Sequence, residues 1–92
     1  MERRKHRRIP FARSVTVSRN GADSCLLESE DISLTGIRLY SDVPVDVGEE
    51  LTMNFYVVPR GEAHELHMQG HVQHVELAQD GYTLGVDFSD ID

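Results

Sequence analysis

Residues 51–57 have the sequence LTMNFYV, and this stretch decides the fold because apolar and more polar side chains alternate along it. Successive side chains of an extended chain point to opposite faces, so a period of two indicates a strand with one buried face. Leu51, Met53, Phe55 and Val57 form that face. The segment therefore predicts a β-strand that contributes every second residue to a core.

The same period of two occurs in segments on both sides of this stretch, and residues typical of tight turns separate these alternating segments. Residues 66–77 are ambiguous between helix and strand, although Gly70 interrupts the helical pattern and favours a strand. Six short strands predict an all-β fold, a six-stranded antiparallel β-barrel, because closure removes exposed strand edges. The other predicted strands are 13–18, Ser24–Ile32, 37–41 and 82–88, with turns at Asn20-Gly21, 33–36, Pro59–Gly61 and Asp80-Gly81.

The length of 92 residues and the hydrophobic content of 39% suit one small domain over residues 1–92. No apolar run approaches the roughly 18 residues of a membrane-spanning helix, and the charged N-terminus lacks the apolar part of a secretory signal. The single cysteine, Cys25, excludes an internal disulfide and favours a reducing compartment. We therefore expect a cytoplasmic protein that does not engage the membrane.

Positive charge is concentrated at the start of the chain. Residues 1–13 carry six Lys/Arg against one Glu, which is +5, whereas residues 14–92 carry three against fifteen Asp/Glu, which is −12. This contrast argues against a general nucleic-acid surface and predicts a local clamp for a small anion. Pro10 disfavours a helix at Ile9, so we expect an arm over residues 1–10 that enters a barrel over residues 11–92 in extended form.

A second polar motif, Asp31-Ile-Ser-Leu-Thr-Gly36, follows the predicted strand Ser24–Ile32. Asp31 and Ser33 are two residues apart, so their side chains share a face of an extended segment. A carboxylate can accept hydrogen bonds from a guanine edge, and Gly36 permits a positive φ or a close backbone approach. The structural alternative is a turn in which Asp31 and Ser33 bond their own backbone, and for this hexapeptide alone that alternative is the more common one.

Two motifs in this order resemble the PilZ domain, whose members are receptors for the bacterial second messenger cyclic di-GMP. Arg4 and Arg8 fit the pattern Arg-x-x-x-Arg, and Asp31, Ser33 and Gly36 fit Asp/Asn-x-Ser-x-x-Gly. The resemblance covers nearly the whole chain and implies a PilZ-like barrel with a flexible arginine-rich arm. The family usually has a helix after the last strand, and here we expect that helix to be short or absent.

The resemblance also implies a ligand site for cyclic di-GMP. Arg4 and Arg8 would be the paired arginines of the arm, and Arg3 before them is compatible with an intercalated pair of ligand molecules. Arg3 and Arg7 offer an alternative register, but the first assignment lets Ile9-Pro10 follow directly. The barrel half of the site would be Asp31, Ser33 and Gly36, and ordering of the arm would signal to an unknown downstream protein.

Other functions are weighed against this one. Some PilZ-like domains serve as protein adaptors without binding nucleotide, and this is the main alternative. A barrel that binds single-stranded nucleic acid would need a basic groove with stacking aromatics, which the acidic body does not offer. The sequence shows no Ser/His/Asp order, phosphate loop or carboxylate pair, so we expect neither an enzyme nor a cofactor.

Four histidines follow at intervals of three, four and three residues. On a helix they would share one face at metal-ligand spacing. On a strand His67 and His71 would share one face while His64 and His74 point to the other, so we expect solvated strand residues and no metal site.

Overall fold

The computed structural model describes residues 9–19 and 24–88, which form seven strands and one short 3₁₀ helix. The predicted turn at Asn20-Gly21 lies outside the described residues. The predicted strands are confirmed, most within one residue of their expected bounds. The elements are β1 (Ile9–Pro10), β2 (Ser14–Arg19), β3 (Ser24–Ile32), β4 (Gly36–Ser41), β5 (Glu50–Val57), η1 (Pro59–Gly61), β6 (His64–Ala78) and β7 (Gly81–Phe88).

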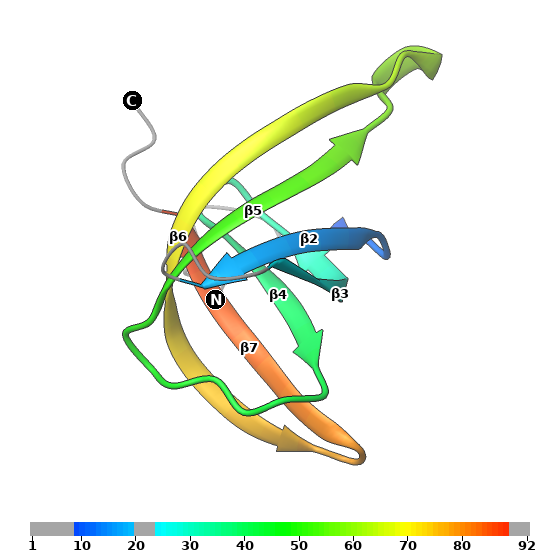
Figure 1. The fold of residues 1–92 in the computed structure, drawn as a ribbon. Coiled ribbons are helices and arrows are strands. Elements are labelled where there is room, and N and C mark those ends of the chain that lie inside the picture. The colour runs from blue at the N-terminus through cyan, green and yellow to red at the C-terminus, as the bar shows by residue number, and fades with distance from the viewer. Residues whose placement is uncertain (1–8, 20–23, 89–92) are drawn as a thin grey trace, which may run out of the picture.

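Six of these strands close into an antiparallel barrel in the order β3-β2-β5-β6-β7-β4, and β4 pairs back with β3 (Figure 1). The short strand β1 adds to β3 at its C-terminal end. Closure pairs the strand edges of the barrel body, which limits edge-to-edge association there. The predicted six-stranded barrel is therefore confirmed.

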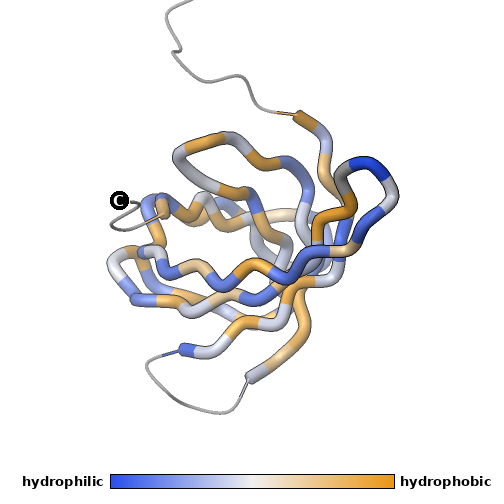
Figure 2. The backbone as a smooth tube through the Cα atoms, turned by 90° about the horizontal axis from the view of Figure 1, so that it is seen from above, coloured by the Kyte–Doolittle hydropathy of each residue, from blue (hydrophilic) through white to orange (hydrophobic). Residues whose placement is uncertain are grey.

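The core lies inside the barrel and consists of the alternate residues that the sequence pattern indicates. The predicted inward residues of β5, Leu51, Met53 and Phe55, are each at most 2% exposed. Apolar and polar positions alternate along the strands, as the tube coloured by hydropathy shows (Figure 2). The other fully buried residues come from all remaining barrel strands except β3 and include Val15, Val17, Ile37, Leu39, Val72, Leu84 and Val86.

The ambiguous segment is one long strand, β6, which pairs with β5 through its first half and with β7 through its second. Beyond the barrel body, β5 and β6 continue as a projecting hairpin (Figure 1). The register of β6 on β7 shifts between Val72 and His74, which marks a β-bulge. No helix in the described part of the chain combines the length and the apolar character required to cross a membrane.

The bulge corrects the expected orientation of one histidine. Without it, His74 would lie on the opposite face from His67 and His71. Val72 is fully buried and Val75 packs against the core, so the extra residue turns His74 outward. His74 therefore shares the outer face with His67 and His71, because one inserted residue reverses the alternation that follows it.

Candidate functional site

The N-terminal segment joins the barrel beside the Asp31 motif. Ile9 pairs with Ile32 and Pro10 pairs with Asp31, so β1 lies along the last two residues of β3. The next residue continues this contact, because the backbone N–H of Phe11 donates a 3.0 Å hydrogen bond to the carbonyl of Glu30. The extended entry expected at Ile9-Pro10 is confirmed, and its register on β3 was not evident from the sequence.

Ser29 anchors the chain between β1 and β2. Ser29 is buried, with 4% of its surface exposed, and its hydroxyl donates to the carbonyl oxygen of Phe11. The same hydroxyl accepts a 2.9 Å hydrogen bond from the backbone N–H of Arg13. The register of β3 on β4 shifts between Ser29 and Asp31. Ser29 therefore holds the incoming chain against β3 at the irregularity just before Asp31.

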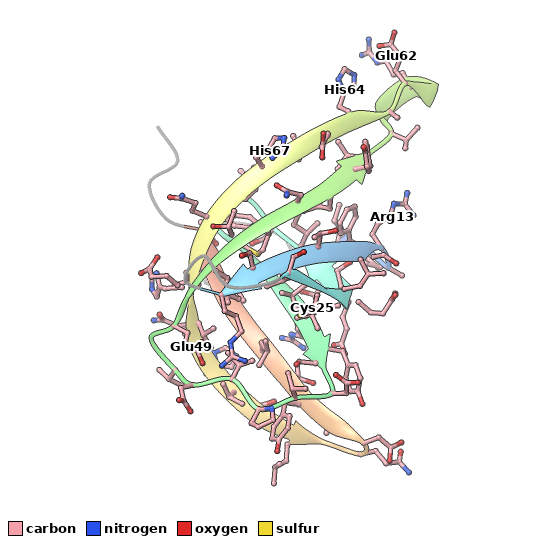
Figure 3. All side chains as sticks on the ribbon, viewed as in Figure 1. Arg13, Cys25, Glu49, Glu62, His64 and His67 are labelled. Atoms are coloured by element: carbon pink, nitrogen blue, oxygen red, sulfur yellow. The ribbon has the colours of Figure 1, made fainter. Side chains whose placement is uncertain are left out.

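Phe11 provides the apolar part of this anchor. Its ring meets the ring of Phe55 edge-on, with the centroids 5.6 Å apart, and it packs against the core. The guanidinium of Arg13 lies 5.5 Å from the centre of the Phe11 ring, on the outer side of the barrel (Figure 3). Aromatic packing and a cation–π contact thus add to the hydrogen bonds of Ser29.

Asp31 faces outward on β3, because its neighbour Ile32 packs against the core. Its carboxylate Oδ2 lies 3.7 Å from Nε of Arg38 on the adjacent strand β4. The two side chains are 22% and 43% exposed, so the ion pair lies at the surface. Sequence reasoning missed Arg38, although its position two residues after Gly36 on a predicted strand gives it the outward orientation that its partner needs.

The connection from β3 to β4 is a tight turn that begins at Ser33. The backbone N–H of Ser33 donates to the carbonyl of Gly36 at 2.9 Å, and the Ser33 hydroxyl accepts a 3.2 Å hydrogen bond from the backbone N–H of Thr35. The turn is tied to β7, because the N–H of Phe88 donates to the Thr35 carbonyl at 2.8 Å. The alternative in which Ser33 bonds the backbone of its own turn is therefore correct for this residue, which lies two residues after Asp31.

Gly36 is required by packing between strands rather than by an unusual backbone angle. Its φ is not positive, whereas Gly48 and Gly61 have φ of 95° and 80°. Gly36 is buried, and a Cβ at this position would clash with the carbonyl oxygen of Val86 on β7. The glycine therefore lets β4 approach β7 closely, and this contact accounts for it without any ligand.

Three of the predicted site residues thus lie at one end of the β3–β4 pair: Asp31 near the end of β3, Ser33 in the turn and Gly36 at the start of β4. The other three, Arg3, Arg4 and Arg8, lie outside the described residues. Ile9, the first described residue, pairs with Ile32, so the described chain begins at the end of β3 that carries Asp31.

A family model described as PilZ domain matches residues 2–92. The chain belongs to the PilZ family. PilZ domains form a cyclic di-GMP receptor family, and they are binding or adaptor domains rather than enzymes. No curated protein sequence matches this PilZ domain.

Two solved structures share its fold. The Bacillus subtilis inhibitor of motility (MotI/DgrA) superposes with a TM-score of 0.86 at 16% sequence identity, and the match covers 100% of this PilZ domain. The domain spans 45% of that longer chain. The PilZ domain of CeSA from a cellulose-synthesizing bacterium gives a TM-score of 0.64 at 20% identity, over 94% of this chain and 82% of that one. At these identities the likeness concerns the fold.

One strong ion pair lies elsewhere on the PilZ barrel. The guanidinium of Arg19 on β2 donates two hydrogen bonds, of 2.9 and 2.8 Å, to the carboxylate of Glu49 before β5. The Glu49 carboxylate also accepts a 2.7 Å hydrogen bond from the N–H of Asp46. The hydrogen bonds from Arg19 are the largest cause of the lowered pKa of Glu49. The same hydrogen bonds raise the pKa of Arg19. This pair stabilises the segment before β5 and is not part of the β3–β4 connection.

The histidines do not assemble a metal centre within residues 9–19 and 24–88, where no group of three or more His, Cys, Asp or Glu could hold an ion. His64 and His67 are spread along the projecting hairpin with Glu62 (Figure 3). His67 Nδ1 lies 2.6 Å from Asn54 Oδ1, and His64 Nε2 lies 3.5 Å from a Glu62 carboxylate oxygen. These contacts are local to the hairpin surface.

Proposed function

We propose that this PilZ domain is a receptor for cyclic di-GMP, and that the ligand binds between the arginine arm and the β3–β4 connection. The observation that carries the proposal is the pairing of Ile9 with Ile32 and of Pro10 with Asp31. This register puts the attachment point of the Arg-x-x-x-Arg motif beside Asp31 and Ser33, so both halves of the motif pair can reach one ligand.

The arginines suit this ligand for a chemical reason. A guanidinium donates in a planar fork to guanine O6 and N7, and it bonds phosphate oxygens equally well. Arg4 and Arg8 would clamp guanine and phosphate, with Arg3 assisting. Each charge-assisted hydrogen bond contributes about 1.5–3 kcal/mol, which must offset an ordering cost of about 1–2 kcal/mol per arm residue.

The β3–β4 connection would supply the complementary half. Asp31 would accept hydrogen bonds from the N–H groups of a guanine edge, and Ser33 would add a hydroxyl contact. Gly36 would act indirectly, because it holds β4 close to β7 beside the turn that carries Ser33. The acidic remainder of the domain repels an anionic ligand elsewhere, which favours a single site.

Signalling would follow from closure of the arm over the ligand. An arm fixed by new charge-assisted hydrogen bonds presents a different surface to a downstream protein. The single cysteine, Cys25, is compatible with a reducing compartment, so we propose that the receptor works in the cytoplasm. The alternative function is a PilZ adaptor that recognises a protein partner without nucleotide.

Isothermal titration calorimetry with cyclic di-GMP tests the proposal, with cyclic di-AMP as the control ligand. We expect saturable binding in the micromolar to nanomolar range for the guanine nucleotide alone. A stoichiometry near two would support an intercalated pair of ligand molecules. Absence of binding to the folded domain would reject the receptor function in favour of the adaptor function.

A further inference from the structure

The projecting hairpin leaves one strand edge without a partner among the described residues. β6 pairs with β5 from His64 onward, but its pairing with β7 begins only at Gly70. Residues 64–69 therefore have β5 on one side and no described strand on the other, along the outer margin of the hairpin (Figure 1). At about 3.4 Å per residue, this free edge of β6 is about 20 Å long.

The backbone groups on the free edge follow from the hydrogen bonds on the other side of β6. The N–H of Val72 donates a 2.9 Å hydrogen bond to the carbonyl of Glu49, immediately before β5, so Val72 directs its backbone groups toward β5. β6 pairs with β5 without a register shift, and backbone directions alternate along a regular antiparallel strand. The odd-numbered residues 65–69 therefore direct their N–H and C=O groups away from β5, toward the free edge.

This edge has few of the features that usually prevent a strand from pairing with another chain. Residues 64–69 are His-Glu-Leu-His-Met-Gln, with no lysine, no proline and a single carboxylate, Glu65. The register on β5 is regular, so no β-bulge twists this part of β6 away. Leu66 and Met68 pack against the core and are only partly buried. The edge therefore offers both backbone groups and apolar surface to an added strand.

The sequence of the edge is complementary to itself. Two copies related by a two-fold axis pair antiparallel, and their edge-directed backbone groups face each other only if the axis passes through residue 65, 66 or 67. An axis at Glu65 sets carboxylate against carboxylate, and an axis at His67 sets imidazole against imidazole. An axis at Leu66 instead sets Glu65 opposite His67 twice, and unlike pairs of this kind stabilise a sheet whereas like charges destabilise it.

We propose that a second copy of this domain docks on the free edge of β6, antiparallel and centred on Leu66, so that the two hairpins form one continuous sheet. The backbone groups of Glu65 in each copy bond those of His67 in the other, and the two Leu66 side chains meet on the inner face. The proposal is independent of the receptor function, because no nucleotide contact enters it. The edge is short, so the interface is smaller than the standard size of about 1,200 Å² or more, and the dimer forms only at high protein concentration.

Sedimentation velocity over a range of protein concentrations, without nucleotide, tests the dimer. We expect the average mass to rise from that of one copy toward that of two. His67→Glu places a second carboxylate opposite Glu65 on both sides of the axis, so association should weaken about tenfold. Exchanging the two residues in the double variant Glu65→His/His67→Glu restores unlike pairs and should restore association. Thr52→Glu is the matched control, because it adds a carboxylate to the exposed face of β5, which β2 and β6 flank, and it should associate normally.

A second measurement uses the unmodified domain and does not depend on the folding of any variant. In ¹⁵N-labelled protein, raising the concentration should slow hydrogen exchange at the amides of Glu65 and His67, while Gly61 at the hairpin tip exchanges at a constant rate. A mass that stays at one copy would overturn the proposal. So would a dimer in which these two amides gain no protection, one that His67→Glu leaves intact, or one that the folded double variant fails to restore. Each of these outcomes leaves the receptor function untouched.

Discussion

The hydroxyl of Ser29 accepts a hydrogen bond of 2.9 Å from the backbone N–H of Arg13, sixteen residues earlier in the chain. It also donates to the carbonyl oxygen of Phe11. One buried side chain thus satisfies two backbone groups of the segment that joins β1 to β2. Because β1 lies against Asp31, the placement of Ile9 and Pro10 beside the candidate site depends on this serine.

Ser29→Ala should leave those two backbone groups without their partner, at a cost of about 1–3 kcal/mol in the free energy of unfolding. Urea unfolding measures the loss. We also expect weaker binding of cyclic di-GMP, because the arm is no longer held beside Asp31. Ser24→Ala on the exposed start of β3 is the control and should change neither quantity. Normal ligand affinity in a destabilised Ser29→Ala protein would show that the serine supports the fold alone.

Arg4→Ala and Arg8→Ala should each remove most of the affinity for cyclic di-GMP, since each loses charge-assisted hydrogen bonds to guanine and phosphate. The melting temperature should stay nearly unchanged, because the core of the described barrel is formed by residues within 11–88. Arg60→Gln removes one positive charge at the hairpin and should bind normally. Raising the salt concentration should weaken binding to the unmodified domain. A large fall in melting temperature would make the arm a structural element instead.

Asp31→Asn should reduce the preference for cyclic di-GMP over cyclic di-AMP, because an amide cannot accept both N–H groups of a guanine edge as a carboxylate does. Competition titrations with the two nucleotides measure the preference. Asp80→Asn, at the exposed β6–β7 turn, gives the same change in net charge and should leave the preference intact. Equal weakening for both nucleotides would mean that Asp31 does not distinguish the bases.

Gly36→Ala should destabilise the barrel by at least about 2 kcal/mol, because the new methyl group meets the carbonyl oxygen of Val86 and overpacking costs about 1–3 kcal/mol. The three heavy atoms nearest to a Cβ on Gly85 all belong to the exposed imidazole of His74, which can move, so the free energy of unfolding of Gly85→Ala should change by less than about 1 kcal/mol. Urea unfolding of the two variants compares them directly. Similar stabilities would contradict the close approach of β4 to β7.

The Arg19–Glu49 pair should make stability depend on pH in one direction. The pKa of Glu49 is lowered in the folded state from an ordinary 4.5, so its contribution is present above pH 4.5 and is lost as the pH falls through the folded value. Glu49→Gln should therefore cost about 1 kcal/mol at pH 7 and much less at pH 3. Unfolding at both pH values measures this, with the exposed Glu76→Gln as a control. A constant difference would mean that the charge is unimportant.

The strands could be predicted from the sequence because side-chain alternation is a local property. The pattern at 51–57 fixed which residues of β5 are buried, and Ser24–Ile32 was found with the same bounds. Closure into a six-stranded barrel followed from strand number and from the resemblance to PilZ domains, whereas the pairing of β3 with β4 is known only from the structure. These features depend on short-range periodicity, which a single sequence records directly.

The details of the candidate surface could not be predicted, because they depend on register. The residue types around Val72 do not predict the bulge that turns His74 outward. The pairing of Arg38 with Asp31 on one side and Gly85 on the other is likewise a relation between distant segments. Gly36 matched a ligand motif, yet its buried contact with Val86 is a requirement of the barrel that the motif does not reveal. Ser29 lacked any signal beyond its position in a strand.

Closure of the barrel also links the ligand to the lifetime of the protein. Asp31, Arg38, Gly85 and His74 come from both halves of the chain and are neighbours only while the barrel is folded. A ligand that binds only the folded barrel adds about 2.7 kcal/mol to the free energy of unfolding at one hundred times its dissociation constant. For a domain of this size that is a large fraction of the total stability. If cyclic di-GMP binds as proposed, cells rich in it would degrade this domain more slowly, so the abundance of the domain would follow the ligand concentration.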